Sequence, residues 1–358
     1  MFKHSEYMHW AKTRSHARFN LATSGVGSFS LRDLPFRAED LEINGPTVYG
    51  YAPLLEAIAG KHGVDPECVV TAAGTSGANH LAMATLLGPR DEVLIEHPAY
   101  ELLVSTALYL QADVKRFPRR EENGYALDPD EVRRAISPKT KLIVVTNLHN
   151  PSSALTREPA LEEIGDMARS VGARVLVDEV YLDAVWENTP RTAALLGPEF
   201  VVTNSLTKVY GLSGLRCGWI LAAPDLARAM WQLNNLFGVN AAHPAELLSV
   251  LAFENLDCIR AHHRAKVEQD RRTLEAFLAQ ETRVSAPKTE YGTTAFLRLA
   301  EGDVDSFLDR LRERYETSAV PGRFFEMASH FRVGMGVNPE MFAEGLRRIR
   351  LALNEAER

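Results

Sequence analysis

The chain has 358 residues, of which 46% are hydrophobic and 24% charged, and its formal net charge is −7. This composition is typical of a folded globular protein with a core large enough to enclose a ligand, and it excludes disordered, collagen-like and disulfide-scaffold proteins. A mildly acidic chain is also a poor general nucleic-acid binder, because backbone phosphates require a basic surface.

The cysteines, the apolar runs and the first residues indicate where the protein works. Cys68, Cys217 and Cys258 are scattered and have no metal-ligand spacing, which favours free thiols in a reducing compartment. No stretch approaches the ~18–20 apolar residues of a membrane span, and Met1–Glu6 lacks the apolar run of a secretory signal. We therefore expect a cytoplasmic protein with no metal, nucleic-acid or membrane partner.

From about residue 65 onward, short β-rich runs alternate with longer stretches of helical periodicity. The strand-like runs are Cys68–Thr71, Glu92–Glu96, Asp113–Phe117, Lys141–Thr146, Arg174–Val177, Phe200–Asn204 and Gly218–Ala222. The helical stretches between them include Gly77–Leu87, Tyr100–Leu110, Pro129–Ile136 and Thr156–Ser170. Asp128 before Pro129 is typical of a helix N-cap, and Thr156 is a second candidate for that role.

This alternation predicts an α/β fold with a mostly parallel seven-stranded sheet between layers of helices. The last third differs, because the long charged helical stretch Glu254–Gln280 precedes strands and helices typical of a smaller α+β domain. We place the large domain at residues 45–275 and form the small domain from residues 1–44 and 276–358. In such sheets ligands bind beyond the carboxyl ends of the strands, so the residues after each strand are the functional candidates.

Polar motifs follow several of the predicted strands. After the first strand, Gly74–Asn79 combines a glycine-rich turn with a helix N-terminus, which can bind phosphate through backbone N–H groups. The segment contains neither a Walker pattern nor a dinucleotide fingerprint. The Asn150-Pro151 turn follows Lys141–Thr146, and Asp178 directly follows Arg174–Val177. Taken alone, each of these also has an ordinary interpretation as a loop, turn or cap.

The segment Ser205–Trp219 is the strongest local signal. It follows a hydrophobic strand and contains Lys208 and Arg216 as its only charged residues. An amine that is desolvated in such a segment has a lowered pKa and attacks aldehydes as a nucleophile. A single lysine in a glycine-rich loop is more often a plain surface residue, so this interpretation depends on the other motifs.

Taken in chain order, the motifs resemble those of the fold-type-I pyridoxal-phosphate enzymes, in particular the class I and II aminotransferases. The resemblance extends over essentially the whole chain. It rests on Gly74–Asn79, the Asn150-Pro151 turn, Asp178-x-x-Tyr181, and Ser205-x-x-Lys208 with Arg216 eight residues after the lysine. It implies the PLP-dependent transferase fold, with pyridoxal 5'-phosphate as the cofactor.

The resemblance also implies a role for each matching residue. Lys208 would form a Schiff base with the cofactor aldehyde and then carry the proton, and Asp178 would keep the pyridine nitrogen protonated. Tyr181 and Asn150 would hydrogen-bond the 3-hydroxyl oxygen of the ring, and Tyr100 would lie against the ring face. The phosphate would be held by Ser205, Arg216 and the turn of Ser76, Gly77 and Ala78.

Further matches concern the substrate and a second subunit. Arg332 matches the small-domain arginine that binds the α-carboxylate of the substrate, and Gly25 or Gly27 lies near that carboxylate in relatives. In this family a tyrosine of the neighbouring subunit usually reaches the phosphate, and Tyr49 and Tyr51 are the candidates. The resemblance therefore implies a homodimer with shared active sites.

The residues that would select the substrate depart most from the family pattern. The turn after Asn150-Pro151 has Ser152-Ser153 where relatives usually have Thr-Gly. A second arginine, for a side-chain carboxylate, has no assigned place, and Arg14, Arg18 and Arg323 are the candidates. The resemblance therefore does not predict the identity of the substrate.

The expected reaction transfers an amino group between an L-amino acid and a 2-oxo acid. β-Elimination, decarboxylation, racemisation and cyclisation of an amino-acid side chain use the same cofactor residues, and the sequence leaves them open. A non-catalytic sensor of the cofactor or of an amino acid is a second alternative, although residues 1–44 are too short for a winged helix with a linker.

Overall fold

A seven-stranded sheet forms the centre of the larger part of the protein, and the computed structural model describes residues 4–355. The strand order is β2-β8-β7-β6-β5-β3-β4, and all neighbours are parallel except β8, which is antiparallel to β2 and β7. The predicted mostly parallel sheet is confirmed. Its strands are β2 (Val69–Ala73), β3 (Glu92–His97), β4 (Asp113–Pro118), β5 (Thr140–Thr146), β6 (Arg174–Asp178), β7 (Phe200–Ser205) and β8 (Cys217–Leu221).

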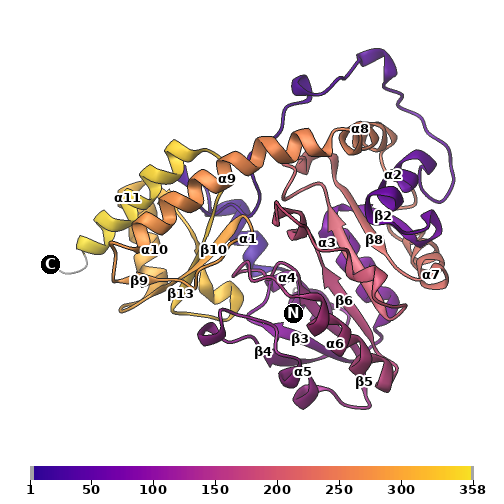
Figure 1. Cartoon of the computed structure of the whole chain (residues 1–358), viewed down its shortest axis with the longest axis horizontal. Helices are drawn as coiled ribbons and strands as arrows, with labels where there is room; N and C mark the ends of the chain where they lie inside the picture. Colours follow the sequence, from indigo (N-terminus) through magenta and orange to yellow (C-terminus); the bar gives the residue numbers. More distant parts are fainter. Residues whose placement is uncertain (1–3, 356–358) are drawn as a thin grey trace.

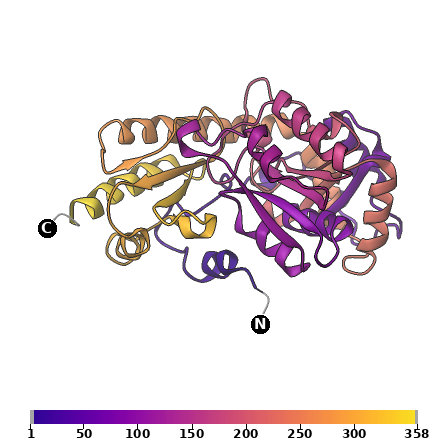
Figure 2. The same ribbon diagram turned by 90° about the horizontal axis from the view of Figure 1, so that it is seen from below.

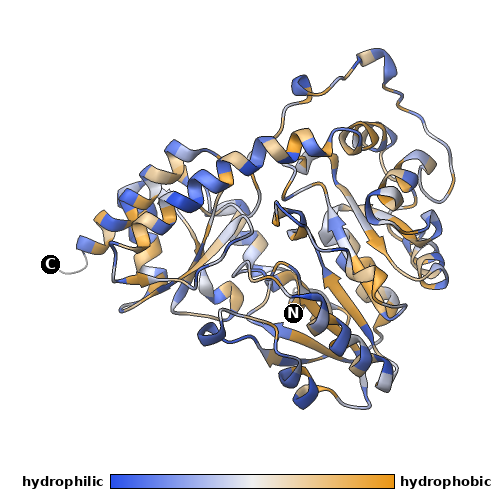
Figure 3. Cartoon of the chain, viewed as in Figure 1, coloured by the Kyte–Doolittle hydropathy of each residue, from blue (hydrophilic) through white to orange (hydrophobic). Residues whose placement is uncertain are grey.

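Helices cover both faces of this sheet (Figure 1). Within β6, Val175 and Val177 contribute to the core on one face and Leu176 to the core on the other, because successive side chains of a strand alternate. The central strands are therefore apolar on both sides, which Figure 3 shows as a hydrophobic centre between more polar outer helices. One face packs against α3 (Gly74–Leu86), α4 (Glu101–Tyr109) and α7 (Pro224–Asn234), and the other against α2 (Ala52–His62), α5 (Pro129–Ala135), α6 (Glu158–Val171) and α8 (His243–Phe253).

The smaller part contains a four-stranded antiparallel sheet in the order β12-β13-β10-β9. Leu297, Phe331 and Leu346 belong to its separate hydrophobic core. Its strands are β9 (Val284–Ser285), β10 (Thr294–Leu299), β12 (Val320–Pro321) and β13 (His330–Gly334), and its helices are α10 (Val304–Tyr315) and α11 (Pro339–Glu355). The predicted smaller α+β unit is thus present, while the domain boundaries stay a prediction.

The helix α9 (Leu256–Leu278) joins the two parts (Figure 1). Ile259, near its start, packs in the core of the larger part, and Leu274 and Phe277, near its end, pack in the core of the smaller part. A helix of this length extends about 35 Å, so it passes along both cores.

The N-terminal segment also connects the two parts. The helix α1 (Glu6–Thr13) lies beside the place where they meet (Figure 2), and β1 (Phe19–Asn20) pairs in parallel with β11 (Thr317–Ser318). Phe29 then packs in the core of the larger part, and residues 35–49 form an exposed arm that projects from it (Figure 1). Short 3₁₀ helices complete the elements: Leu31–Asp33, Ala38–Asp40, Pro66–Cys68, Glu121–Asn123, Leu182–Ala184, Ala193–Leu195, Ser213–Leu215 and Gly322–Phe325.

Two local predictions about helix starts have different outcomes. The Asp128 side chain accepts a hydrogen bond from the Asp130 N–H at 2.9 Å, which confirms it as the N-cap of α5. Thr156 is not a cap, because α6 begins at Glu158 and the Thr156 hydroxyl instead accepts a hydrogen bond from Arg119 Nη2 at 3.1 Å. The Thr156 hydroxyl, which the local sequence predicts to cap α6, thus serves instead as a hydrogen-bond acceptor for the buried Arg119 guanidinium.

Residues 4–355 contain neither a candidate membrane span nor a candidate metal site. None of the helices there combines the length and apolarity that crossing a bilayer requires. The same residues contain no group of three or more His, Cys, Asp or Glu side chains arranged to hold a metal ion.

Candidate active site

An inner cavity of about 340 Å³ lies at the carboxyl ends of the sheet strands. Its wall comes from α1, from the segment around β1, from the start of α3, and from the loops that follow β5, β6 and β7. Parallel strands end at the same edge of a sheet, which is why motifs distant in sequence meet here. The predicted residues that line the inner cavity are Ser76, Tyr100, Asn150, Asp178, Tyr181, Lys208 and Arg216.

Asp178 is a buried carboxylate in the wall of the inner cavity. It accepts hydrogen bonds from Asn79 Nδ2 at 2.8 Å and from the Val180 N–H at 3.1 Å. Burial raises the pKa of Asp178 to about 6, although these hydrogen bonds and the charge of Lys208 act in the opposite direction. The arrangement can accept a hydrogen bond from a protonated ring nitrogen and hold its charge.

Lys208 places its amine in the same cavity. Nζ donates a hydrogen bond to Ser24 Oγ at 2.7 Å. Desolvation lowers the pKa of Lys208 to about 8; the positive charges of Arg332 and Arg216 act in the same direction, and Asp178 acts against them. An amine with this pKa is partly neutral near pH 8, so it can serve as a nucleophile or as a base.

The turn between β2 and α3 forms a cradle beside Arg216. Gly74 has a φ of +71°, which L side chains rarely adopt, and a Cβ built on it would lie 2.3 Å from Arg216 Nη2, so a side chain there would be strained and would displace the guanidinium. Arg216 is held by the carbonyl oxygens of Ala73 at 3.0 Å and Ser213 at 3.3 Å. The start of α3 also offers unpaired backbone N–H groups. A guanidinium beside a helix N-terminus is suited to a phosphate.

Arg332 is fully buried and is not part of the wall of the inner cavity. Its Nη1 donates to Asn150 Oδ1 at 2.8 Å and its Nη2 to the Tyr7 hydroxyl at 2.9 Å, and both of these partners do line the cavity. The Nε atom of Arg332 has no hydrogen-bond partner among the described residues. The guanidinium is thus separated from the cavity by Asn150 and Tyr7.

Other predicted residues lie near the inner cavity or away from it. Ser205 is buried at the end of β7, where its hydroxyl accepts a hydrogen bond from Thr75 Oγ1 at 2.8 Å. A Cβ on Gly25 would lie 3.0 Å from the Lys208 carbonyl oxygen, so this glycine contacts the lysine backbone. Gly77 and Ala78 belong to the first turns of α3 but are not in the wall. Their predicted contacts stay predictions.

Tyr49 lies outside the inner cavity of its own chain. Its side chain is 52% exposed, its ring packs against Trp231, and its hydroxyl accepts a hydrogen bond from Asn235 Nδ2 at 3.1 Å. Tyr51 packs edge-on against His243. Neither tyrosine approaches Lys208 within one chain, so a role for Tyr49 in the site requires a second copy of the chain and stays a prediction.

Several residues of the cavity wall were missed from the sequence. Thr75 and Asn79 lie inside the Gly74–Asn79 motif, so the motif itself contained their signal. Asn79 also accepts a hydrogen bond from Thr203 Oγ1 at 2.6 Å, which fixes the amide that holds Asp178. Ser24 comes from the N-terminal segment, where no motif or spacing identified it as a partner of Lys208.

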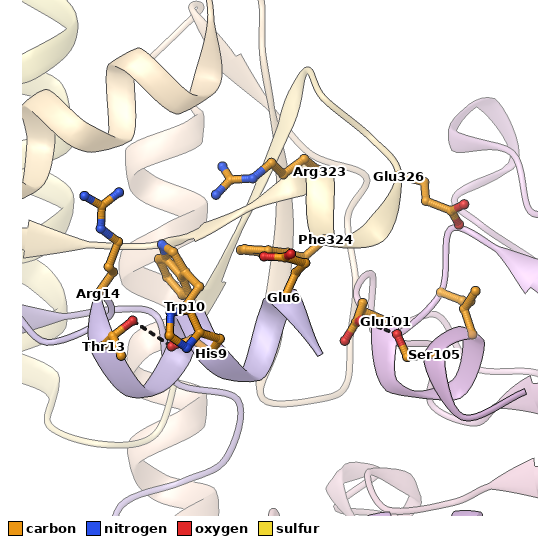
Figure 4. Close-up of a pocket in the computed structure, with 12 residues that line it drawn as sticks. Glu6, His9, Trp10, Thr13, Arg14, Glu101, Ser105, Arg323, Phe324 and Glu326 are labelled. Carbon is orange, nitrogen blue, oxygen red and sulfur yellow. Dashed lines mark hydrogen bonds between the residues drawn. The ribbon is translucent and has the colours of Figure 1, made fainter. Parts of the chain in front are cut away.

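An outer cavity of about 800 Å³ lies on the opposite side of α1 (Figure 4). Glu6 and Trp10 project from α1 into it, Arg14 projects from the residue that follows α1, and Arg323 projects from the 3₁₀ helix that also contains Phe324. Arg14 and Arg323, two candidates for a side-chain carboxylate, therefore line the outer cavity and not the inner one. Arg18, the third candidate, lies 3.7 Å from Glu316 in an exposed ion pair.

The inner cavity fits pyridoxal 5'-phosphate. Lys208 and Asp178 line one cavity, so an amine for the aldehyde and a carboxylate for the ring nitrogen are both present. Arg216 and the cradle at Gly74 supply a place for the phosphate at the same sheet edge. The Lys208 amine, the Asp178 carboxylate and the Arg216 guanidinium thus suit, respectively, the aldehyde, the ring nitrogen and the phosphate of this cofactor.

Comparisons with known proteins agree with this geometry. A model of the family described as aminotransferase class I and II matches residues 38–349. Capreomycidine synthase of Streptomyces vinaceus is 30% identical over 350 residues, which cover 93% of this chain and 89% of that protein.

Solved structures show the same fold. A PLP-dependent aminotransferase from Streptococcus suis superposes with a TM-score of 0.92, at 26% identity and with 99% of each chain covered. The PLP-dependent cyclase OrfR superposes with a TM-score of 0.90, at 24% identity, with 99% of this chain and 98% of that chain covered. The match over most of the chain, together with the cavity that contains Lys208 and Asp178, leads to one conclusion: the chain belongs to the aminotransferase class I and II family, whose members use pyridoxal 5'-phosphate.

Proposed function

We propose that this protein is an aminotransferase that moves an amino group between an L-amino acid and a 2-oxo acid. The observation that supports this most directly is that Lys208 is the single amine in the wall of the inner cavity, as far as residues 4–355 are concerned. One base can remove a proton from the α-carbon and return it at a neighbouring position on the same side. Transamination needs no more than that.

The residues of the wall divide this task. When bound, pyridoxal 5'-phosphate supplies an aldehyde that condenses with amines and a ring that accepts electron density. Lys208 Nζ holds and moves the proton of the substrate α-carbon, and its lowered pKa leaves part of the amine neutral. Asp178 holds a proton on the ring nitrogen by charge and by hydrogen bonding. Arg216 and the start of α3 anchor the phosphate.

The remaining wall residues orient the ring and the substrate in this proposal. Tyr181 and Asn150 hydrogen-bond the ring hydroxyl, and Tyr100 covers one ring face. Burial raises the pKa of both Tyr100 and Tyr181, so both hydroxyls stay protonated and donate hydrogen bonds near neutral pH. The carboxylate of the amino acid approaches the positive charge of Arg332.

A second candidate is a synthase reaction, such as cyclisation of an amino-acid side chain, on the same cofactor. It is favoured by one observation: the relative at 30% identity over 93% of the chain is named capreomycidine synthase and not a transaminase. The cofactor residues would be shared, and the two reactions would differ in how the cavity orients the substrate bonds.

A half-reaction experiment separates these functions. We expect the purified holoenzyme, mixed with an amino acid alone, to release one equivalent of 2-oxo acid per site and then to stop until a second 2-oxo acid is added. Continuous release of 2-oxo acid and ammonia would show a lyase, and a ring product without 2-oxo acid would show a cyclase. Binding without any conversion, across a panel of amino acids, would show a sensor.

The same assay tests the role of Lys208. We expect Lys208→Ala to reduce turnover at least ~10³-fold, because both the nucleophile and the base are lost. The variant should still bind the cofactor, through the phosphate and ring contacts. Normal turnover and an unchanged cofactor absorbance in Lys208→Ala would contradict the assignment of this lysine.

We also propose that the active protein is a homodimer. Exposed apolar side chains of the N-terminal arm, the end of α4 and the residues that follow α7 form a strip. Beside it, Asn235 bonds Tyr49, and the ring of His80 on α3 contacts both Phe237 and Tyr109. A contiguous apolar surface of this kind is typical of an interface. The apolar strip consists of Tyr49, Tyr109, Leu236, Phe237 and Val239, each 49–77% exposed.

A further inference from the structure

Tyr7 is a buried residue of α1 that lines the inner cavity and whose hydroxyl bonds the buried Arg332. The hydroxyl accepts a hydrogen bond from Arg332 Nη2 at 2.9 Å, and the Tyr7 side chain is part of the cavity wall. Arg332 itself is 0% exposed. A ligand in the inner cavity therefore meets Tyr7 and Asn150 before it meets the guanidinium.

The ring of Tyr7 is fixed by aromatic neighbours on several elements. It packs edge-on against Tyr100 at 5.7 Å and Phe324 at 5.4 Å, and it lies 6.2 Å from Phe325. These contacts come from both the larger and the smaller part of the protein. The hydroxyl is thus held in one place by packing that does not depend on the hydrogen bond alone.

The Tyr7 hydroxyl keeps one proton available for a ligand. It accepts from Arg332, and within residues 4–355 no hydrogen bond in which it donates is present. A hydroxyl that accepts a hydrogen bond from a cation becomes a stronger donor, because each bond polarises the next. The group best suited to receive such a proton is an anionic oxygen.

We propose that the Tyr7 hydroxyl is a direct ligand of the substrate α-carboxylate and transmits the charge of Arg332 to it. This inference rests on the proposed function, in which Arg332 attracts that carboxylate. It adds a residue of the N-terminal helix to the set that positions the amino acid. It also explains why the arginine is buried behind a tyrosine instead of being open to the cavity.

The test compares Tyr7→Phe with the parent holoenzyme. The substitution keeps the ring and its packing and removes only the hydroxyl. We expect the dissociation constant of a carboxylic acid that resembles the substrate but lacks the amino group, measured by calorimetry, to rise about tenfold. KM for the amino donor should rise similarly, kcat should change less than about twofold, and the affinity for the corresponding amine without a carboxylate should stay unchanged.

Trp10→Phe is the matched control, because Trp10 projects from the opposite side of α1 into the outer cavity and packs on Phe324 (Figure 4). It perturbs the packing of the same helix and should leave both dissociation constants unchanged. If Tyr7→Phe left the carboxylic acid affinity unchanged or made it tighter, or weakened the amine equally, the proposal would be overturned.

Arg332→Gln separates this proposal from the proposed function, because it removes the positive charge. In that background we expect Tyr7→Phe to weaken the carboxylic acid by much less than tenfold, since the hydroxyl then has no charge to transmit. If Arg332→Gln alone did not weaken the carboxylic acid, the proposed role of Arg332 would fail. If Arg332→Gln weakened it and Tyr7→Phe did not, only the role of Tyr7 would fail.

Discussion

Burial acts on Lys208 and Asp178 in opposite directions. It lowers the pKa of the amine to about 8 and raises that of the carboxyl to about 6, because in both cases the charged form loses hydration. The two groups nevertheless keep enough hydrogen bonds and mutual attraction to remain within reach of their charged forms near pH 7. Burial at the sheet edge therefore makes it easier for the Lys208 amine to lose a proton, while Asp178 can still become the carboxylate that a protonated ring nitrogen requires.

Burial also raises the pKa of Glu179, which does not line the inner cavity. It follows Asp178 and is 1% exposed; its Oε1 accepts a hydrogen bond from the Ala193 N–H at 2.7 Å, and its Oε2 has no partner among the described residues. Burial raises the pKa of Glu179 to about 8, and the charge of Asp183 acts in the same direction while that of Lys61 opposes it. The folded protein therefore favours the protonated carboxyl.

This predicts a pH-dependent effect of Glu179→Gln on stability. Because the folded pKa lies above the unfolded one, the stability that the protonated carboxyl provides is complete below the unfolded pKa of about 4.5 and is lost as the pH rises to about 8. We expect the Tm of Glu179→Gln to equal that of the parent near pH 4.5 and to exceed it by at least ~3 °C at pH 8.

Differential scanning calorimetry across this pH range checks the prediction. Glu162→Gln is the control, since Glu162 is an exposed carboxyl on α6. A Tm difference for Glu179→Gln that stayed constant between pH 4.5 and 8 would show that Glu179 does not change its protonation on unfolding.

The turn from β2 into α3 is the element that shapes the phosphate end of the cavity. Its first residue, Gly74, has a left-handed backbone and lies in close contact with Arg216, so a side chain there would be strained and would push the guanidinium away. Three residues later, a Cβ on Gly77 would meet its nearest atom at 3.4 Å, which is ordinary contact. Two glycines of one turn therefore differ in how far they tolerate alanine.

We expect Gly74→Ala to weaken the binding of pyridoxal 5'-phosphate about tenfold or more, because the new methyl group displaces the Arg216 guanidinium. Gly77→Ala should keep the affinity within about twofold, since its backbone N–H is retained. Titration of the apoprotein, followed by absorbance, measures both, and pyridoxal without phosphate should bind both variants alike. Equal affinities of the two variants for the phosphorylated cofactor would refute this account of the turn.

The position of α1 between the two cavities decides which charges the substrate meets. Arg14 and Arg323 lie on the outer side, so the cations of the inner wall, as far as residues 4–355 are concerned, are Lys208 and Arg216, with Arg332 behind it. Each of these already has a part in the proposal. A second carboxylate on the substrate would be buried without a partner of its own.

From this we expect amino donors with a neutral side chain to be preferred. Aspartate and glutamate should have a kcat/KM at least ~10-fold below that of neutral amino acids of similar length, which corresponds to about 1.4 kcal/mol. A panel of donors assayed with one 2-oxo acid measures this. Preference for a dicarboxylic donor would show instead that a cation reaches the cavity from a second copy of the chain.

Association of two copies is tested at the apolar strip. Phe237→Asp places a charge in its centre, where Phe237 is 62% exposed and contacts His80. We expect this change to shift the molar mass in light scattering from that of a dimer to that of a monomer and to lower activity if Tyr49 acts across the interface. Leu351→Asp, at a 38% exposed leucine of α11, is the control that should leave the mass unchanged.

Much of this organisation was predictable from the chain alone. The alternation of apolar runs with helical stretches determines a mostly parallel sheet with two covered faces. The positions of Asp178 at the end of β6 and of Lys208 shortly after β7 determine that they share one sheet edge. These features are readable because the apolar period of a strand or helix, and the residue that ends it, are properties of a few neighbouring positions.

The contacts that complete the site were decided only by the tertiary structure. Ser24 bonds Lys208 across 184 positions of sequence, and Tyr7 bonds Arg332 across 325. No local pattern predicts that Ser24 bonds Lys208 or that Tyr7 bonds Arg332, because these partners are set by how the N-terminal segment packs between the two parts of the protein. The same packing separates Arg14 and Arg323 from the inner cavity, and it depends on the buried surfaces of the whole chain at once.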